Sequence, residues 1–207
     1  MEKVRKMLYG ELDPYSNLQP LPYDDSGWNS HSPVFKEIID KIKPNLIIEV
    51  GTWLGKSARY MATLASKYNP DFEIVCIDTF LGSHENWEGQ HIKGYINGRP
   101  NLYEQFISNV VHSKLEKYIT PFPIDSINGY IVLQKKNIEA DVIYIDAGHD
   151  YVSVKQDINR WRTLVKPSGC LIGDDYAFSS DIRKAVEEEF GNGNFQVSGE
   201  KFIWWKK

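Results

Sequence analysis

Short apolar runs alternate along the chain with longer segments in which apolar residues recur every three or four positions. The runs are typical of buried strands and lie at 46–50, 74–77, 118–122, 141–145 and 169–173. The longer segments have the period of half-buried helices and lie at 33–43, 57–68, 102–115, 128–136, 152–164 and 180–190. Residues 194–206 add two strand-like runs around Gly199. The alternation predicts an α/β fold with a doubly wound, mostly parallel sheet that closes with an antiparallel hairpin.

Two segments fall outside this alternation. Residues 11–33 hold four of the ten prolines, so we expect an irregular N-terminal arm over residues 1–31 and a single domain over 32–207. Ser32 followed by Pro33 is typical of a helix start. Residues 80–101 are rich in glycine and aromatic residues, and loops of this length are usually lids, binding loops or disordered stretches.

The composition is that of an ordinary globular protein. Of the 207 residues 42% are apolar and 25% are charged, and the net charge of −4 argues against a nucleic-acid partner. No apolar run approaches the ~20 residues of a membrane span, and the first residues lack the apolar core of a secretory signal. Cys76 and Cys170 lie within apolar runs, as buried thiols do in a reducing compartment. We therefore expect a cytoplasmic protein without a membrane partner.

A glycine turn follows the first predicted strand, in the sequence IIEVGTWLGKS. A P-loop would need glycine five residues before Gly55, and Val50 stands there. A dinucleotide-binding turn would need glycine where this chain has Trp53, because a pyrophosphate approaches the backbone at that point. The turn therefore favours a nucleotide-like ligand without phosphates.

Acidic residues end three of the predicted strands. Asp78 follows the second strand, where a carboxylate can accept both hydroxyls of a ribose, although it can also simply cap a loop. Asp146 ends the fourth strand, and Asp174 and Asp175 end the fifth. If those two strands are neighbours, their ends lie ~5 Å apart. Three carboxylates so close would repel one another unless a cation offsets their charge.

An oxygen-only ligand set suits Mg²⁺, Ca²⁺ or Mn²⁺. The alternative is that one or two of the three carboxylates cap helices and another faces solvent. His149 lies three residues beyond Asp146, and with an ordinary pKa of ~6.5 it is a candidate general base or else a simple polar contact. Together these residues indicate a cofactor-dependent enzyme that holds a hard metal ion.

In these segments the chain resembles the class I S-adenosylmethionine-dependent methyltransferases. It is most similar to the small metal-dependent O-methyltransferases, the macrocin O-methyltransferase-like family. EVGTWLGKSA resembles the first motif of that family, IDTF its ribose-binding end, and IDAGHDYVSVKQDINRWRTLVKPSGCLIGDDY its most specific stretch. The resemblance covers residues 32–176, and the C-terminal hairpin also fits. It implies a Rossmann-like, seven-stranded sheet.

The resemblance also implies roles for individual residues. The cofactor would be held at its methionine end by Glu49, Gly51, Thr52, Trp53 and Ser57, at its ribose by Asp78 and Thr79, and at its adenine by Asp125 and Ser126. Asp146, Asp174 and Asp175 match the metal ligands, with Mg²⁺ the expected ion, and Asp146 also borders the cofactor. The catalytic base would be His149 or Asp146. The expected reaction is methylation of a sugar or another small-molecule hydroxyl.

Other functions remain open at this point. One is a module that binds S-adenosylmethionine or a nucleotide without catalysis, and another is a metal-dependent hydrolase, which has no use for the glycine turn. The acceptor is also open: the resemblance favours a sugar hydroxyl, and a catechol or other small molecule is the alternative. His84, Trp87 and Tyr95 could stack on an acceptor or pack a local lid. The arm and the aromatic residues Phe202, Trp204 and Trp205 could serve a homo-oligomer interface or belong to the core.

Overall fold

The computed structural model describes residues 3–27 and 30–206. Its strands are β1 (Leu46–Val50), β2 (Glu73–Asp78), β3 (Tyr95–Ile96), β4 (Arg99–Pro100), β5 (Ile119–Pro123), β6 (Ala140–Ile145), β7 (Val165–Gly173), β8 (Gln196–Ser198) and β9 (Lys201–Trp205). Its helices are α1 (Val4–Tyr9), α2 (Pro33–Ile42), α3 (Lys56–Ala65), α4 (His84–Glu88), α5 (Leu102–His112), α6 (Ser126–Lys135), α7 (Tyr151–Trp161) with the 3-10 turn η1 (Arg162–Leu164), and α8 (Ser180–Phe190).

Seven strands form one sheet in the order β5-β2-β1-β6-β7-β9-β8. The first five are parallel to their neighbours, whereas β9 is antiparallel to both β7 and β8. The chain builds outward from β1 through β2 to β5 and then returns to the other side of β1 with β6. This is the doubly wound, mostly parallel sheet with a C-terminal hairpin that the sequence predicts. The strand order reverses between β1 and β6, where open α/β sheets bind ligands.

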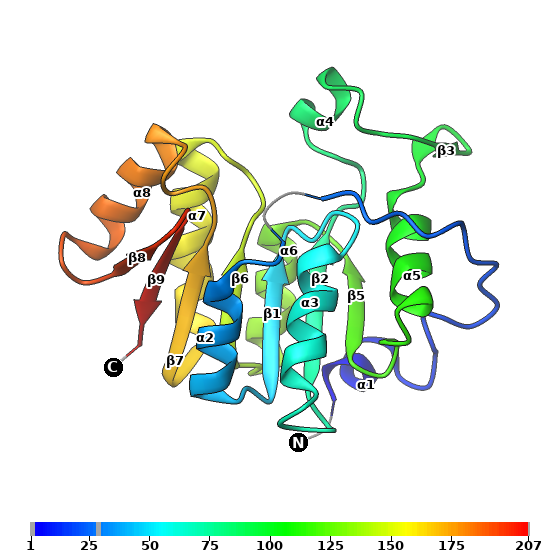
Figure 1. Ribbon diagram of the computed structural model, residues 1–207, viewed down its shortest axis with the longest axis horizontal. Coiled ribbons are helices and arrows are strands. Elements are labelled where there is room, and N and C mark those ends of the chain that lie inside the picture. Colours follow the sequence, from blue (N-terminus) through cyan, green and yellow to red (C-terminus); the bar gives the residue numbers. More distant parts are fainter. Residues whose placement is uncertain (1–2, 28–29, 207) are drawn as a thin grey trace.

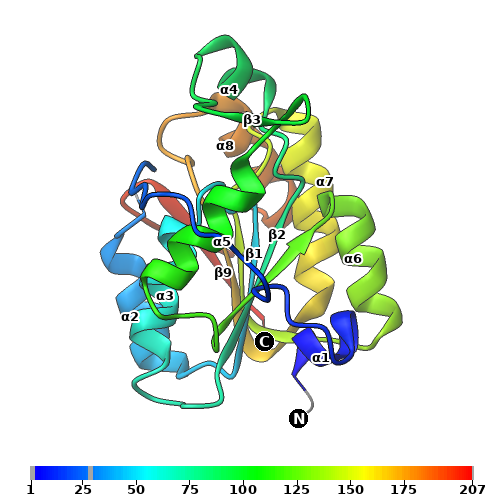
Figure 2. The same ribbon diagram turned by 90° about the vertical axis from the view of Figure 1, so that its right-hand side faces the viewer.

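Helices cover both faces of the sheet (Figures 1 and 2). On one face α2, α3 and α5 pack through residues such as Phe35, Met61 and Phe106. On the other face lie α6, α7 and α8, together with the short α1. Figure 1 shows α4 and the β3–β4 hairpin standing above the end of the sheet toward which β1 runs. The carboxyl ends of the parallel strands therefore lie below residues 80–101, which we call the lid segment.

The N-terminal arm differs from the irregular segment expected over residues 1–31, because Val4–Tyr9 form a helix. A six-residue helix is too short to be stable alone. Glu73 stabilises this one, since its carboxylate accepts the backbone N–H groups of Val4 at 2.8 Å and Arg5 at 2.9 Å. The contact joins residues that are 69 positions apart in the chain, so it cannot be inferred from the local pattern of apolar residues.

Candidate functional site

The glycine turn after β1 bends through three residues in the left-handed region. Gly51, Trp53 and Gly55 have φ values of 84°, 49° and 77°. A side chain at Gly55 would come within 2.6 Å of the Phe106 ring of α5, so glycine is needed there for close packing. The turn ends where α3 begins at Lys56. The backbone of the turn is packed against α5 at Gly55 and against Asp146, at the end of β6, at Gly51.

Glu49 supports the turn from below. Its side chain is fully buried and accepts hydrogen bonds from the hydroxyls of Thr52, at 2.6 Å, and Ser57. Burial raises the pKa of this carboxyl to about 8, against the opposing effect of the two hydroxyl donors. The structure thus places Glu49 behind the turn, bonded to Thr52 and Ser57.

Asp78 fastens the end of β2 to the same turn. Its Oδ2 accepts the backbone N–H groups of Thr52 and Trp53, each at 2.9 Å, and its Oδ1 accepts that of Phe80 at 2.8 Å. Burial raises the pKa of Asp78, while these three N–H donors act to lower it. The carboxylate lines the cavity described next.

One cavity of about 580 Å³ lies at the carboxyl ends of the parallel strands. The predicted site residues that line it are Gly51, Thr52, Trp53, Ser57, Asp78, Thr79, Asp125, Ser126, Asp146, His149, Asp174 and Asp175. On the lid side it is bordered by Ser83, Glu85, Asn86 and His91, and on the arm side by Ser26, Gly27 and Ser30. The fold therefore brings the three sequence motifs to one cavity.

The Asp125–Ser126 pair opens helix α6. Asp125 is its N-cap and accepts the backbone N–H of Asn128 at 2.9 Å. The Ser126 hydroxyl donates to the carboxylate of Asp157 and accepts the indole N–H of Trp161 at 2.9 Å. The Asp125 side chain therefore caps α6, and the Ser126 hydroxyl is bonded to two residues in the second half of α7.

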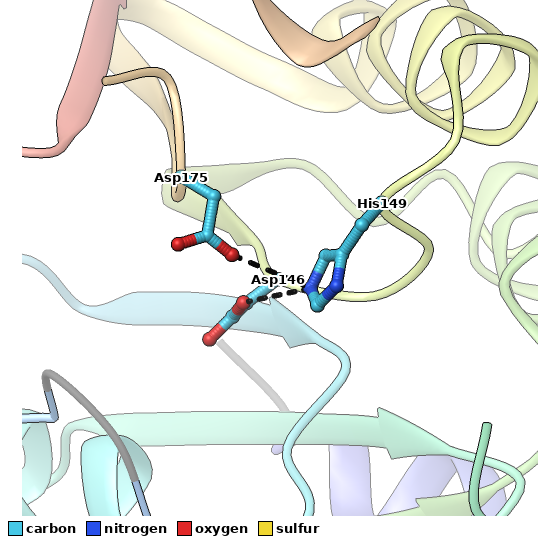
Figure 3. A group of neighbouring side chains, drawn as sticks. All are labelled: Asp146, His149 and Asp175. Atoms are coloured by element: carbon cyan, nitrogen blue, oxygen red, sulfur yellow. Dashed lines mark ion pairs between the residues drawn. The ribbon is translucent and has the colours of Figure 1, made fainter. Parts of the chain in front are cut away.

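The acidic strand ends meet as the sequence predicts, because β6 and β7 are neighbours and Ile145 pairs with Gly173. Ligand atoms of Asp146, His149 and Asp175 lie within 4.8 Å of one another. Figure 3 shows the three side chains gathered together, with His149 paired to both aspartates. Asp174 is not part of this group. Its Oδ2 lies 2.6 Å from the ammonium of Lys201 and accepts the hydroxyl of Tyr144 at 2.6 Å.

Of the three aspartates predicted as metal ligands, Asp146 and Asp175 lie together with His149, whereas Asp174 is paired with Lys201. The metal-ligand role itself stays a prediction. Sequence analysis missed Lys201 because it lies in a short basic tail. The available signal was its place on β9, where Lys201 shares a face with Ile203, two residues on, within an apolar run.

His149 is surrounded by carboxylates. Its Nδ1 lies 3.1 Å from Glu85 of α4, and its Nε2 lies 3.5 Å from Asp175 and 3.9 Å from Asp146. The nearby carboxylate of Asp146, and then the charges of Asp175 and Glu85, raise the pKa of His149 to about 9, against the opposing effect of burial. At neutral pH the imidazole therefore carries two protons and a positive charge.

The aromatic residues of segment 80–101 pack on one another. The Trp87 and Tyr95 ring centroids are 5.8 Å apart, and the Trp87 indole donates to the carbonyl of Leu81 at 3.0 Å. Both rings are about half exposed, at 50% and 55%. This arrangement matches the alternative in which they build a local lid.

A family model described as a methyltransferase domain matches residues 48–176. The match begins in β1 and ends just after Asp175, so it includes the glycine turn, Asp78 and both acidic strand ends. It covers more than half of the chain. The chain belongs to this methyltransferase-domain family, and the predicted likeness to the class I methyltransferases is confirmed.

Solved structures share the fold. An O-methyltransferase from Bacillus cereus in complex with SAH superposes with a TM-score of 0.60 and 16% identity, over 98% of this chain and 90% of that one. The O-methyltransferase TomG from Streptomyces achromogenes, involved in tomaymycin synthesis and solved with SAM, gives 0.63 and 13% over 90% and 84%. At such identities the likeness shows the fold.

A curated relative is much longer than this chain. The uncharacterized protein y4gI of Sinorhizobium fredii (strain NBRC 101917 / NGR234) is 23% identical over 159 residues, which are 76% of this chain and 16% of that protein.

Among the residues that the structure describes, no helix is long and apolar enough to cross a membrane.

Proposed function

We propose that this chain transfers the methyl group of S-adenosylmethionine to a hydroxyl of a small molecule. The observation that carries the proposal is a cavity that joins the glycine turn and Asp78 to Asp146 and His149. Its volume of about 580 Å³ is in the usual range for a small-molecule site. The SAH and SAM bound to the two related structures support the choice of cofactor.

The cofactor would lie across the strand-order reversal. We propose that the backbone of Gly51–Trp53 borders its methionine end, and that Asp78 accepts the ribose hydroxyls with the lone pairs left by its three N–H donors. Thr79 would border the ribose, and the backbone at Asp125 and Ser126 the adenine. Glu49 and Ser57 would act through the turn, since each is bonded to the other behind it.

The chain's own part in the reaction is to orient the acceptor and remove its proton. The acceptor oxygen bonds to the methyl carbon as the carbon–sulfur bond breaks, and the sulfonium becomes a neutral thioether. The hydroxyl proton goes to His149 or Asp146. Since the cofactor is already a strong electrophile, positioning of the oxygen in line with that bond carries much of the rate. His149 can accept the proton only after losing its own, so its high pKa favours reaction at alkaline pH.

A divalent cation is the finer part of the proposal. The hard oxygens of Asp146 and Asp175 suit Mg²⁺, and His149 offers a third ligand atom once it has lost a proton, whereas Asp174 is engaged by Lys201. When bound, such an ion would lower the pKa of the acceptor hydroxyl. Loss of turnover in chelator and its return with Mg²⁺ would support this part, and full turnover in chelator would remove it.

The acceptor we propose is a sugar or another polar small molecule. The lid side of the cavity offers the side chains of Ser83, Glu85 and Asn86, which can bond hydroxyls. Residues 32–207 would form the catalytic domain, with 1–31 as its arm. A cytoplasmic location and the absence of a nucleic-acid partner remain predictions from composition. A homo-oligomer remains a prediction from the N-terminal arm and the aromatic C-terminal residues.

The first experiment is a calorimetric titration of S-adenosylmethionine into chelator-treated protein, repeated with Mg²⁺ and with NAD as the control. We expect micromolar binding of S-adenosylmethionine and none of NAD. Binding would then justify a screen of hydroxyl acceptors, in which tight binding without any transfer would point to a non-catalytic module. No binding in either condition would reject the proposed function.

A further inference from the structure

Lys201 is a buried cation at the edge of the proposed site. Its side chain is 0% exposed, and its ammonium lies 2.6 Å from Oδ2 of Asp174. The rings of Phe35 and Tyr144 lie next to it, with centroids 5.1 Å and 5.3 Å from Nζ. Glu200 approaches at 3.5 Å from the adjacent position. The lysine therefore has a fixed place, packed against aromatic rings and paired closely with Asp174 and more loosely with Glu200.

The partner of Lys201 is equally well held. Asp174 accepts the Tyr144 hydroxyl and the Lys201 ammonium on Oδ2 and the backbone N–H of Asp175 on Oδ1. Its side chain is only 7% exposed. The β7–β9 register, in which Gly173 pairs with Phe202, brings Lys201 beside Asp174. The ion pair thus joins the end of β7 to the start of β9.

Electrostatics explains why a cation is needed here. Asp146, Asp174 and Asp175 converge at the ends of two neighbouring strands, and Tyr144 bonds both Asp146 and Asp174. Buried carboxylates that close together are unfavourable unless a positive charge offsets them. A divalent ion bound to all three would supply that charge. In this chain a lysine already supplies it at Asp174.

We propose that Lys201 is a built-in counter-cation that takes the place of a metal ion at Asp174. It withdraws Asp174 from any set of metal ligands, so the site assembles without a divalent ion, and an ion meets only Asp146, Asp175 and His149. Binding of such an ion is therefore weak. The inference rests on the proposed function only for the identity of the cavity, and it makes Lys201 a positioning residue.

The test compares three proteins after chelator treatment: the wild type, Lys201→Met, and Lys201→Met combined with Asp174→Asn. Methionine keeps much of the lysine's length without its charge, so Lys201→Met leaves Asp174 as a buried carboxylate without a counter-charge. The double variant has the same methionine but lacks that carboxylate charge. Calcium, a hard cation without redox chemistry, is titrated into each by calorimetry, and thermal unfolding is recorded with EDTA and with Ca²⁺ or Mg²⁺.

We expect the wild type to be stably folded in EDTA and to gain only a small rise in unfolding temperature from Mg²⁺, because the ion binds weakly. Lys201→Met should unfold earlier in EDTA, regain stability with Ca²⁺ or Mg²⁺, and bind Ca²⁺ about tenfold more tightly than the wild type, since an unpaired carboxylate attracts the ion. The double variant should lose that gain. A purely structural role of the lysine would leave calcium affinity unchanged.

Two results would overturn the inference: a wild type that needs a divalent ion for its stability, or a Lys201→Met variant that binds calcium no more tightly. If Lys201→Met does not fold even with Mg²⁺, the wild type and the double variant still decide, because a wild type that unfolds in EDTA and recovers its stability with Mg²⁺ contradicts the proposal. Titration of S-adenosylmethionine into the wild type is read separately. Its failure would reject the proposed function and leave the calcium comparison valid.

Discussion

The carbonyl oxygen of Asp146 occupies the space that a side chain at Gly51 would need. A Cβ built on Gly51 would lie 2.0 Å from that oxygen, far inside any real contact. Asp146 also donates its backbone N–H to Val50 at 2.8 Å, so the end of β6 is bonded directly against the end of β1. The turn and the acidic cluster are therefore one unit, and a shift of one moves the other.

Gly51→Ala should consequently destabilise the protein and weaken cofactor binding. The new methyl group meets backbone atoms that cannot rotate away, and φ at this position is 84°. We expect a loss of about 3 kcal/mol or more in the free energy of unfolding, measured by urea denaturation. Gly98→Ala is the matched control, because Gly98 has φ of 79° with nothing within 4 Å of its Cβ position. It should cost only about 1 kcal/mol, and equal losses in the two variants would contradict the role of the Gly51–Asp146 contact.

Asp78→Asn tests the link between β2 and the turn. The amide keeps one acceptor oxygen, so it cannot receive all three N–H groups from Thr52, Trp53 and Phe80. We expect S-adenosylmethionine affinity to fall about 10- to 100-fold, because a lost charge-assisted hydrogen bond costs about 1.5–3 kcal/mol. Calorimetry measures it. Asp71→Asn, at an exposed position before the same strand, is the control and should change nothing.

The regular elements were predictable because their patterns are local. The sequence places α8 at Ser180–Phe190 and β1 at Leu46–Val50, and the structure gives the same bounds. In both cases the apolar period continues to the end of the element. Helix α3 ends at Ala65, three residues before the predicted end at residue 68, since an apolar period does not fix where the last turn closes.

The features that escaped prediction depend on contacts between distant residues. Lys201 reaches Asp174 only because β9 lies beside β7, and Glu73 caps α1 from 69 residues away. The motifs placed Asp146, Asp174 and Asp175 at the same cavity correctly. They could not indicate which carboxylate is bonded to a lysine, since this depends on the order of strands in the sheet.

The carboxylates around His149 predict that activity increases toward alkaline pH. With a pKa of about 9 the imidazole is protonated at pH 7, so if it is the base, kcat/KM should rise with pH up to about 9. Glu85→Gln removes one of the charges that raise this pKa and should move the midpoint to lower pH. Glu88→Gln, exposed on the same helix, is its control. His149→Gln should remove the titration, and an unchanged profile in that variant would assign the base to Asp146.

The stability of the fold should also depend on pH, through the buried carboxyl group of Asp157. The residue is 5% exposed, and burial raises the pKa of its carboxyl to about 6, above the ~3.9 of an unfolded chain. The folded state therefore holds this proton more tightly than the unfolded state does. Stability from this group is fully present below about pH 4 and is lost as the pH rises to about 6, by up to ~3 kcal/mol.

Asp157→Asn removes that loss and keeps an oxygen to accept the hydroxyl of Ser126. The variant should be more stable than the wild type at pH 8, and the difference should narrow as the pH falls to 5, as measured by urea denaturation at each pH. Asp150→Asn on the same helix is a control of opposite sign. Asp150 caps α7, and its bonds to Ser153 and Val152 lower its pKa, so its replacement should destabilise at pH 8. A difference for Asp157→Asn that does not vary with pH would show that packing, rather than ionisation, governs this site.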